Sequence, residues 1–341
     1  MAKKYRVSVI PGDGIGPEIV PPVLRVLHNL AEEVGGFSFD FRLFDAGDAV
    51  KEKTGVALPE ETFQGVKDSD VCLFIAVGET ASEVILPLRQ KLDLYANIRP
   101  SKTYPNVRNS RPGVDLVIVR ENTEDLYRRV EDGSEDWSVA LRMITRRASE
   151  RIARSAFELA TREGRKKVLC VHKANVMKMT CGMFRNACQD VALGYPGIGF
   201  SDMYVDACAL KLVMSPNDFD VIVTTNLFGD ILSDLAAGLV GGLGMAPSGN
   251  IGDSFAVFEP VHGSAPDIAG KGIANPMATL LTAKMMLDWL GEKKAAEVLD
   301  KAVLAVLNEG KALTLDLGGK AKTYEAAEEV SAKIRTVLGD Y

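Results

Sequence analysis

The chain has 341 residues, 47% of them hydrophobic and 25% charged, so it is long enough to bury a core without disulfides. A net charge of −6 without a basic run argues against a nucleic-acid partner, and no apolar run reaches the roughly 18 residues of a membrane span. The five cysteines form no CxxC pair, which favours a reducing compartment. Because the first residues lead directly into a strand-like segment, we expect no secretory leader and a cytoplasmic protein.

Apolar runs alternate with helix-period stretches along most of the chain, which predicts an α/β fold with substantial parallel pairing. The expected strands are 5–11, 37–44, 71–76, 116–120, 167–172 and 219–225. The expected helices are 17–34, 148–163, 176–193, 228–239, 278–290 and 293–307. Between the first strand and the first helix stands Gly12-Asp13-Gly14-Ile15-Gly16. Its last two glycines are one residue too close for the dinucleotide-binding fingerprint, so we interpret it as a tight turn.

Two aspartates in an apolar helical stretch are candidates for a metal site. Asp230 and Asp234 are four residues apart, which places both carboxylates on one face of a helix. Two close carboxylates repel each other unless a cation or a proton lies between them, and hard divalent cations prefer oxygen ligands. The alternative from the residues alone is a carboxylate near a helix start and an unrelated surface aspartate.

Other candidates carry positive charge or a titratable group beside buried strands. Arg89, Arg99 and Arg120 each adjoin apolar or turn sequence, and guanidinium groups bind carboxylates through two parallel hydrogen bonds. Lys173 follows a predicted strand, and a partly desolvated lysine can act as a base; Tyr127 is a further titratable candidate. Taken singly, each of these residues fits a structural role better than a functional one, as does His172.

A loop of small and polar residues, 259–267 and 273–276, follows later in the chain. Its backbone amides can cradle a pyrophosphate, and a carboxylate within it can accept from ribose hydroxyls. The alternative is an ordinary turn-rich connection.

In their order along the chain, these segments resemble the isocitrate/isopropylmalate dehydrogenase family. The resemblance rests on residues 12–18, 95–100, 120–127, 172–175, 226–234 and 259–275. It implies a two-domain α/β fold with a shared mixed sheet that is not a Rossmann fold. The larger domain, with the dinucleotide site, would comprise residues 1–97 and 243–341, and the smaller domain residues 98–242. It also implies a homodimer, possibly a higher oligomer, whose active sites are shared between subunits.

The resemblance also implies a role for each candidate. The substrate carboxylates would be held by Arg89, Arg99 and Arg120. Mg²⁺ or Mn²⁺ would be bound by Asp230, Asp234 and Asp206 of the partner subunit. Lys173 of the partner subunit would take part in removing the hydroxyl proton, and Tyr127 would protonate the enol that is left after CO₂ departs.

The cofactor would be held by His262, Gly263, Ser264, Ala265, Asp267, Ile268 and Asn275. Relatives that prefer NADP usually carry a lysine and a tyrosine where this chain has Asp267 and Ile268. A carboxylate suits free ribose hydroxyls and repels a 2′-phosphate, so we predict NAD.

The substrate is predicted from the segment 83–89. Isocitrate-specific relatives usually have a serine and an asparagine where this chain has Glu83 and Ile85, and Ile85 with Leu86 offers an apolar wall for an isopropyl group. Together with Gly78-Glu79-Thr80-Ala81, which resembles the archaeal isopropylmalate enzymes, this favours oxidative decarboxylation of 3-isopropylmalate in leucine biosynthesis.

Several alternatives stay open. They are NAD-dependent isocitrate or homoisocitrate dehydrogenase, a dehydrogenase of broad specificity for 3-substituted malates, a non-catalytic regulatory subunit and an acyl-phosphate transferase of the same architecture. The complete set of candidate residues argues against the regulatory subunit. The cofactor loop and the arginine set argue against the transferase.

Overall fold

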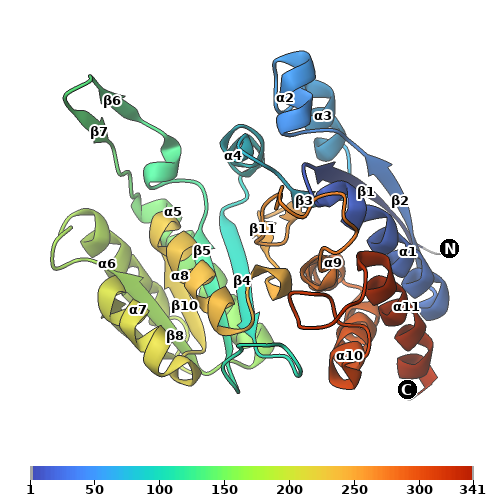
Figure 1. Ribbon diagram of the computed structural model, residues 1–341. Helices are drawn as coiled ribbons and strands as arrows, with labels where there is room; N and C mark the ends of the chain where they lie inside the picture. Colours follow the sequence, from blue (N-terminus) through green and yellow to red (C-terminus); the bar gives the residue numbers. More distant parts are fainter. Residues whose placement is uncertain (1–2, 340–341) are drawn as a thin grey trace.

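A computed structural model describes residues 3–339 as a ten-stranded mixed sheet with flanking helices (Figure 1). The strands, in the order of the sheet, are β2 (Phe37–Leu43), β1 (Lys3–Gly12), β3 (Val71–Ala76), β12 (Ala256–Phe258), β11 (Gly249–Ile251), β4 (Ala96–Lys102), β5 (Asp115–Glu121), β10 (Val221–Thr224), β8 (Lys167–His172) and β9 (Gly199–Tyr204). The first four are parallel to one another, and so are the last four. The pairings β12–β11, β11–β4 and β4–β5 are antiparallel, so the two parallel halves run in opposite directions.

The helices are α1 (Gly16–Val34), α2 (Asp48–Thr54), α3 (Glu60–Lys67), α4 (Ala81–Lys91), α5 (Arg146–Glu163), α6 (Thr180–Ala192), α7 (Val205–Met214), α8 (Asn226–Leu239), α9 (Met277–Leu290), α10 (Lys293–Glu309) and α11 (Thr323–Gly339). All six predicted strands and all six predicted helices are present. One boundary was wrong: the helix expected from residue 176 begins at Thr180, because residues 174–179 form irregular turns. A separate hairpin of β6 (Glu131–Gly133) and β7 (Ser138–Ala140) projects from the molecule (Figure 1).

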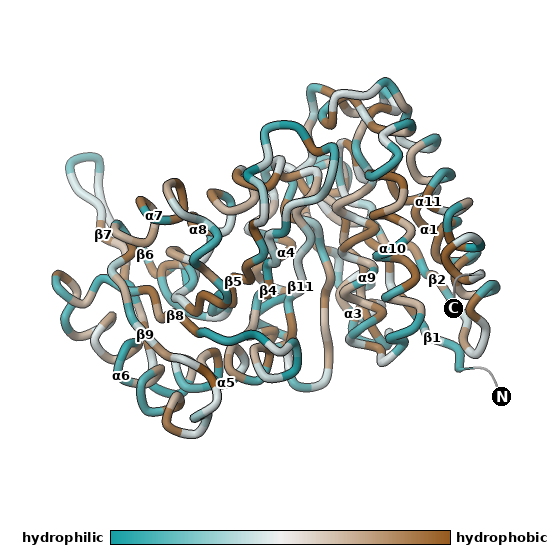
Figure 2. The backbone as a smooth tube through the Cα atoms, turned by 90° about the horizontal axis from the view of Figure 1, so that it is seen from below, coloured by the Kyte–Doolittle hydropathy of each residue, from teal (hydrophilic) through white to brown (hydrophobic). Residues whose placement is uncertain are grey.

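The core is divided between the two halves of the sheet. One apolar cluster draws on both chain ends: it packs strands β1, β2, β3 and β12 against α1, α9, α10 and α11. Figure 2 shows these four helices gathered in one lobe, away from α5 to α8. Alternate residues of β3 face opposite clusters, as do alternate residues of β5, so both sheet faces are buried, as continuously apolar strands predict. Among residues 3–339, no helix combines the length and apolarity that crossing a bilayer requires.

The glycines after β1 form the tight turn that the sequence predicts. Gly12 has φ +70° and Gly14 has φ +58°, in the left-handed region that glycine adopts without steric cost. A Cβ on Gly12 would lie 1.7 Å from the carbonyl oxygen of Ala76 in the neighbouring strand. A Cβ on Gly14 would lie 1.9 Å from the carbonyl oxygen of Ser264. The turn therefore needs glycine at both positions because other backbone lies against it.

We expect Gly12→Ala to lower the free energy of unfolding by roughly 3 kcal/mol, the sum of about 1–2 kcal/mol for the left-handed backbone and about 1–3 kcal/mol for the clash. Gly36→Ala is the matched control, because Gly36 has φ +86° but no atom within 4 Å of the added Cβ. The control should lose only the backbone contribution. Urea unfolding of both variants measures the difference, and equal losses would contradict the steric argument.

Candidate active site

Arg120 is the most deeply buried charged group of the site. It occupies the end of β5 with 1% of its surface exposed and donates to the side-chain oxygen of Asn226 through Nε at 2.9 Å and Nη2 at 2.7 Å. Gly229 on α8 makes room for it, because a Cβ there would lie 2.6 Å from Arg120 Cγ. Burial lowers the pKa of Arg120 to about 10, so the guanidinium is still charged at neutral pH. The fold thus holds a positive charge against the first turn of α8.

Arg99 reaches the same helix from the neighbouring strand β4. Its Nη1 donates to Ser233 Oγ at 2.7 Å and lies 3.3 Å from Asp234 Oδ1 and 3.4 Å from Asp230 Oδ1. Its Nε donates to Asn97 Oδ1 at 2.7 Å. Burial lowers the pKa of Arg99, although both aspartates oppose that shift.

The two aspartates of α8 share one face and have different electrostatic surroundings. Burial raises the pKa of Asp230, but the positive charges of Arg120 and Arg99 outweigh it and hold that pKa below its usual value. Asp230 also accepts hydrogen bonds from Arg120 and from the hydroxyl of Tyr127. For Asp234, burial prevails over the attraction of Arg99, and the pKa is raised. The i,i+4 prediction is correct in its geometry: the pair lies on one face of α8, beside the arginines.

Arg89, near the end of α4, is the third arginine. Its Nη2 donates to Glu259 Oε1 at 2.7 Å, and both side chains are buried. Its Nε is buried without an acceptor in the described residues. A buried donor of this kind requires a partner, and a bound carboxylate would supply one.

Lys173 and Asp206 form a pair of their own. Lys173 Nζ donates to Asp206 Oδ1, and this hydrogen bond lowers the pKa of Asp206. His172 precedes the lysine, accepts from the amide of Ala174 and contacts Asp202 Oδ2 through Nε2 at 3.0 Å, which fixes the chain at Lys173. Within residues 3–339 this pair makes no hydrogen bond or ion pair with Asp230, Asp234 or Tyr127. The described residues also contain no group of three or more His, Cys, Asp and Glu side chains able to hold a metal.

The loop expected to hold a dinucleotide lies beside the first turn of the chain. The amide of Ile15 donates to the carbonyl of Ser264 at 2.9 Å. Ala265 has φ +41°, a strained conformation that such loops use at binding sites. His262 Nε2 is buried without a partner in the part of the chain that is described, and burial lowers the pKa of this imidazole. The side chain of Asn275 is satisfied internally: it donates to Asp316 at 2.9 Å and accepts from the amide of Met277.

The model of a known family matches residues 6–332; its description is "Isocitrate/isopropylmalate dehydrogenase". The chain belongs to this family. The prediction made from the ordered motifs is thereby confirmed. Family membership makes the protein a decarboxylating hydroxy-acid dehydrogenase, as the sequence predicts.

Individual members are similar over nearly the full length. A 3-isopropylmalate dehydrogenase of Archaeoglobus fulgidus is 55% identical, with 96% of this chain and 98% of that protein covered. An isocitrate/homoisocitrate dehydrogenase of Thermus thermophilus is 52% identical, with 98% and 99% covered. The crystal structure of isocitrate dehydrogenase from Methylococcus capsulatus superimposes with a TM-score of 0.92 at 43% identity and covers 97% of this chain and 99% of that one. The predicted family fold with its shared mixed sheet is therefore confirmed.

Ile85 and Leu86 of α4, which were predicted to line the substrate site, have different surroundings from each other. Ile85 packs into a core cluster with Phe74 and Leu88, whereas Leu86 is buried but belongs to none of the core clusters of the described residues. Glu83 forms an ion pair with Lys51 at 2.6 Å, so its charge is offset.

Three residues of the hydrogen-bond network around the arginines were not singled out from the sequence: Asn97 and Glu259, which contact Arg99 and Arg89, and Asn250, which contacts Asn97 and Glu259. Asn97 accepts from Arg99, Asn250 donates to Glu259, and Glu259 accepts from Arg89. In the sequence they are only polar residues within or directly after short strands, and hydrophobic periodicity does not predict what such residues contact.

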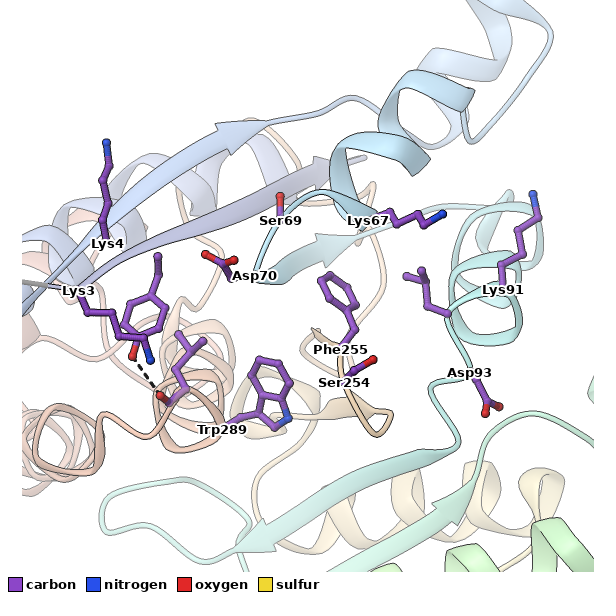
Figure 3. Close-up of a pocket in the computed structure, with 13 residues that line it drawn as sticks. Lys3, Lys4, Lys67, Ser69, Asp70, Lys91, Asp93, Ser254, Phe255 and Trp289 are labelled. Atoms are coloured by element: carbon purple, nitrogen blue, oxygen red, sulfur yellow. Dashed lines mark hydrogen bonds between the residues drawn. The ribbon is translucent and has the colours of Figure 1, made fainter.

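A cavity of about 910 Å³ lies elsewhere, at the amino-terminal ends of β1 and β3 (Figure 3). Phe255 and Trp289 line it, and Lys67 and Lys91 stand at its margin. None of the predicted site residues lines it.

Proposed function

We propose that this enzyme oxidises and decarboxylates 3-isopropylmalate to 2-oxoisocaproate with NAD and Mg²⁺ or Mn²⁺. The reaction would be a step of leucine biosynthesis and would take place in the cytoplasm. The observation that carries the chemistry is the convergence of Arg99, Arg120 and Tyr127 on two carboxylates of one helix. The name of the Archaeoglobus fulgidus relative and the apolar Leu86 support the isopropyl substituent. The five cysteines are free and buried, in keeping with a reducing compartment.

The arginines bind and orient the substrate in this proposal. Arg89 Nε, buried without an acceptor, would donate to one carboxylate, and the guanidinium groups of Arg99 and Arg120 would hold the other. Three buried positive charges close together repel one another, and a dianionic substrate relieves that repulsion.

The donor set of α8 fits a hard divalent cation. Asp230 and Asp234 supply two oxygen ligands on one helix face, with 37% and 55% of their side chains exposed. When bound, the cation would polarise the substrate's 2-oxygen and stabilise negative charge there. The third protein ligand would be Asp206 of the partner subunit.

Two titratable groups would move the protons. Lys173 of the partner subunit would take part in removing the hydroxyl proton as hydride leaves C2 for NAD. Tyr127 is half-buried, and burial raises the pKa of its phenol, so it holds its proton at neutral pH and would deliver it to C3 after CO₂ is lost.

A homodimer would complete these sites. Large apolar side chains are exposed on the middle part of the chain, which also holds Lys173 and Asp206: Val130, Trp137, Val139, Leu141, Val176, Met179, Met183, Leu210, Val213, Met214 and Ile231. A second subunit packed on this region would cover such side chains, which supports the dimer. We also place the boundaries of the two domains at residues 97/98 and 242/243; the separate core clusters support this division.

A second candidate is isocitrate or homoisocitrate oxidation. The Lys51–Glu83 ion pair favours it, because it offsets the negative charge that would repel a third carboxylate. A broad specificity would combine the two substrates.

The test is a substrate panel with NAD and Mn²⁺ in which kcat/KM is measured for 3-isopropylmalate, isocitrate and homoisocitrate. We expect 3-isopropylmalate to be preferred, and Leu86→Ala to lower that preference by roughly 10- to 100-fold, the value of a lost apolar contact of about 1–3 kcal/mol. Ile85→Val, a change within the core cluster, is the control and should leave the ratio of the substrates unchanged. Faster turnover of isocitrate by the wild type would establish the second candidate instead.

The cofactor preference is tested at Asp267, which is exposed and whose side chain has no hydrogen-bond partner among the described residues. We expect Asp267→Lys to lower the ratio of kcat/KM for NAD over NADP by at least about tenfold, because the change exchanges repulsion of a 2′-phosphate for attraction. Lys271→Asp, four residues further on, is a control for charge at this surface. An unchanged ratio in Asp267→Lys would contradict the role of Asp267.

A further inference from the structure

The two halves of the sheet meet at the pairing of β11 with β4. Asn250 of β11 pairs in register with Asn97 of β4, and Asn97 pairs with Arg120 of β5. Figure 1 shows β4 and β11 side by side between the two lobes. Neither asparagine has any exposed surface. Buried amides inside strands are costly, so their hydrogen bonds identify what they stabilise.

The hydrogen bonds of these amides form one chain across the joint. Arg99 Nε donates to Asn97 Oδ1 at 2.7 Å, and Asn97 Nδ2 donates to Asn250 Oδ1 at 3.0 Å. Asn250 Nδ2 donates to Glu259 Oε1 at 2.8 Å, and the same oxygen accepts from Arg89 Nη2 at 2.7 Å. This series of hydrogen bonds, the hydrogen-bonded chain, thus links Arg99 to Arg89 through the centre of the sheet.

Two members of this hydrogen-bonded chain, Arg99 and Glu259, belong to different parts of the site. Arg99 lies against the two aspartates of α8. Glu259 follows β12 and begins the loop that contains His262. Every member is at least nine-tenths buried, so water cannot easily replace a broken bond, and each loss leaves a neighbouring donor or acceptor unpaired.

We propose that Asn250 is a positioning residue that couples the substrate-and-metal part of the site to the cofactor part by holding Arg99 and Glu259 in one hydrogen-bonded chain. The inference rests on the proposed function. Asn250 touches neither the substrate arginines nor the aspartates of α8 directly, and it acts through Asn97 and Glu259.

Coupling is measured as the dissociation constant of NADH alone divided by its dissociation constant in the presence of 3-isopropylmalate and Mn²⁺. NADH and 3-isopropylmalate cannot react with each other, so the measurement reports binding alone. The wild type should bind NADH at least about fivefold more tightly when both are present. In Asn250→Ser and in Asn250→Leu, whose side chain is similar in size, this ratio should fall to within about twofold of one. Thermal unfolding shows which of the two variants is folded.

Asn122 offers a matched control. It is also buried, and its Nδ2 donates to the same Asn250 Oδ1 at 2.9 Å, but its other hydrogen bond goes to the carbonyl of Leu94. Asn122→Ser therefore removes an equivalent hydrogen bond but leaves the hydrogen bonds that link Arg99 to Arg89 intact. The coupling ratio of this variant should equal that of the wild type.

Two results would overturn the inference alone: wild-type coupling in a folded Asn250→Ser variant that still turns over substrate, or an equal loss of coupling in Asn122→Ser. A wild type that oxidises no 3-substituted malate would contradict the proposed function, and the inference with it.

Discussion

Asp230→Asn is expected to lower kcat/KM by at least about 10³-fold while the protein stays folded. Asp230 is central to the site, since Arg99, Arg120 and Tyr127 all contact it. The amide keeps the size of the carboxylate and an oxygen that can accept from Arg120, so the packing of α8 on β5 persists. The negative charge that would bind the cation is lost.

The measurements are turnover as a function of Mn²⁺ concentration and Mn²⁺ binding by calorimetry. Asp218→Asn is the control, because Asp218 is an exposed acid in the short turn before β10. The control should match the wild type in both measurements. Normal Mn²⁺-dependent turnover by Asp230→Asn would show that the cation binds elsewhere.

Sequence periodicity predicted the parts of this fold that are buried on both faces. Strands β3 and β10 are entirely buried, and their continuous apolar runs have few other interpretations. The helix that carries Asp230 and Asp234 was predicted because apolar residues recur between the acids at helical spacing. In these segments, the residues that form the core are also the residues that set the pattern.

Periodicity failed where the strands carry the site itself. β4 was not predicted as a strand, because Asn97, Arg99 and Pro100 interrupt its apolar pattern. Asn97 hydrogen-bonds to β11 and Arg99 to α8, and both of these elements are distant in sequence. The short β11 and β12 were missed for the same reason: their pairing across the sheet joint, not their own composition, makes them strands.

The ordered motifs, in contrast, predicted which side chains belong together. Arg99, Arg120, Tyr127 and Asp230 lie in contact as the family resemblance implied, although up to 131 positions separate them along the chain. What composition and spacing do not encode is whether one chain or two supply the groups of the site. A single chain shows Lys173 paired with its own Asp206, with apolar residues such as Met179 and Met214 exposed in the same region.

A heterodimer of two inactive variants is expected to recover about half of the activity of the wild-type dimer. Lys173→Ala removes the proposed base and Asp230→Asn the proposed metal ligand, so each homodimer is inactive at both sites. When the two chains carry different affinity tags and are co-expressed, purification on both tags isolates the heterodimer. One of its two sites then combines an intact Asp230 with an intact Lys173 of the partner subunit, while the other site lacks both groups.

The outcome depends only on whether the site is shared. If each protomer used its own Lys173 with its own Asp230, every site of the heterodimer would lack one group, and activity would stay at the level of the parent homodimers. A second heterodimer, which carries both substitutions in one chain and none in the other, reverses the expectation. Shared sites leave each of its two sites lacking one group, whereas separate sites leave one site complete. Activity in the first heterodimer and not in the second therefore requires that Lys173 acts across the subunit interface.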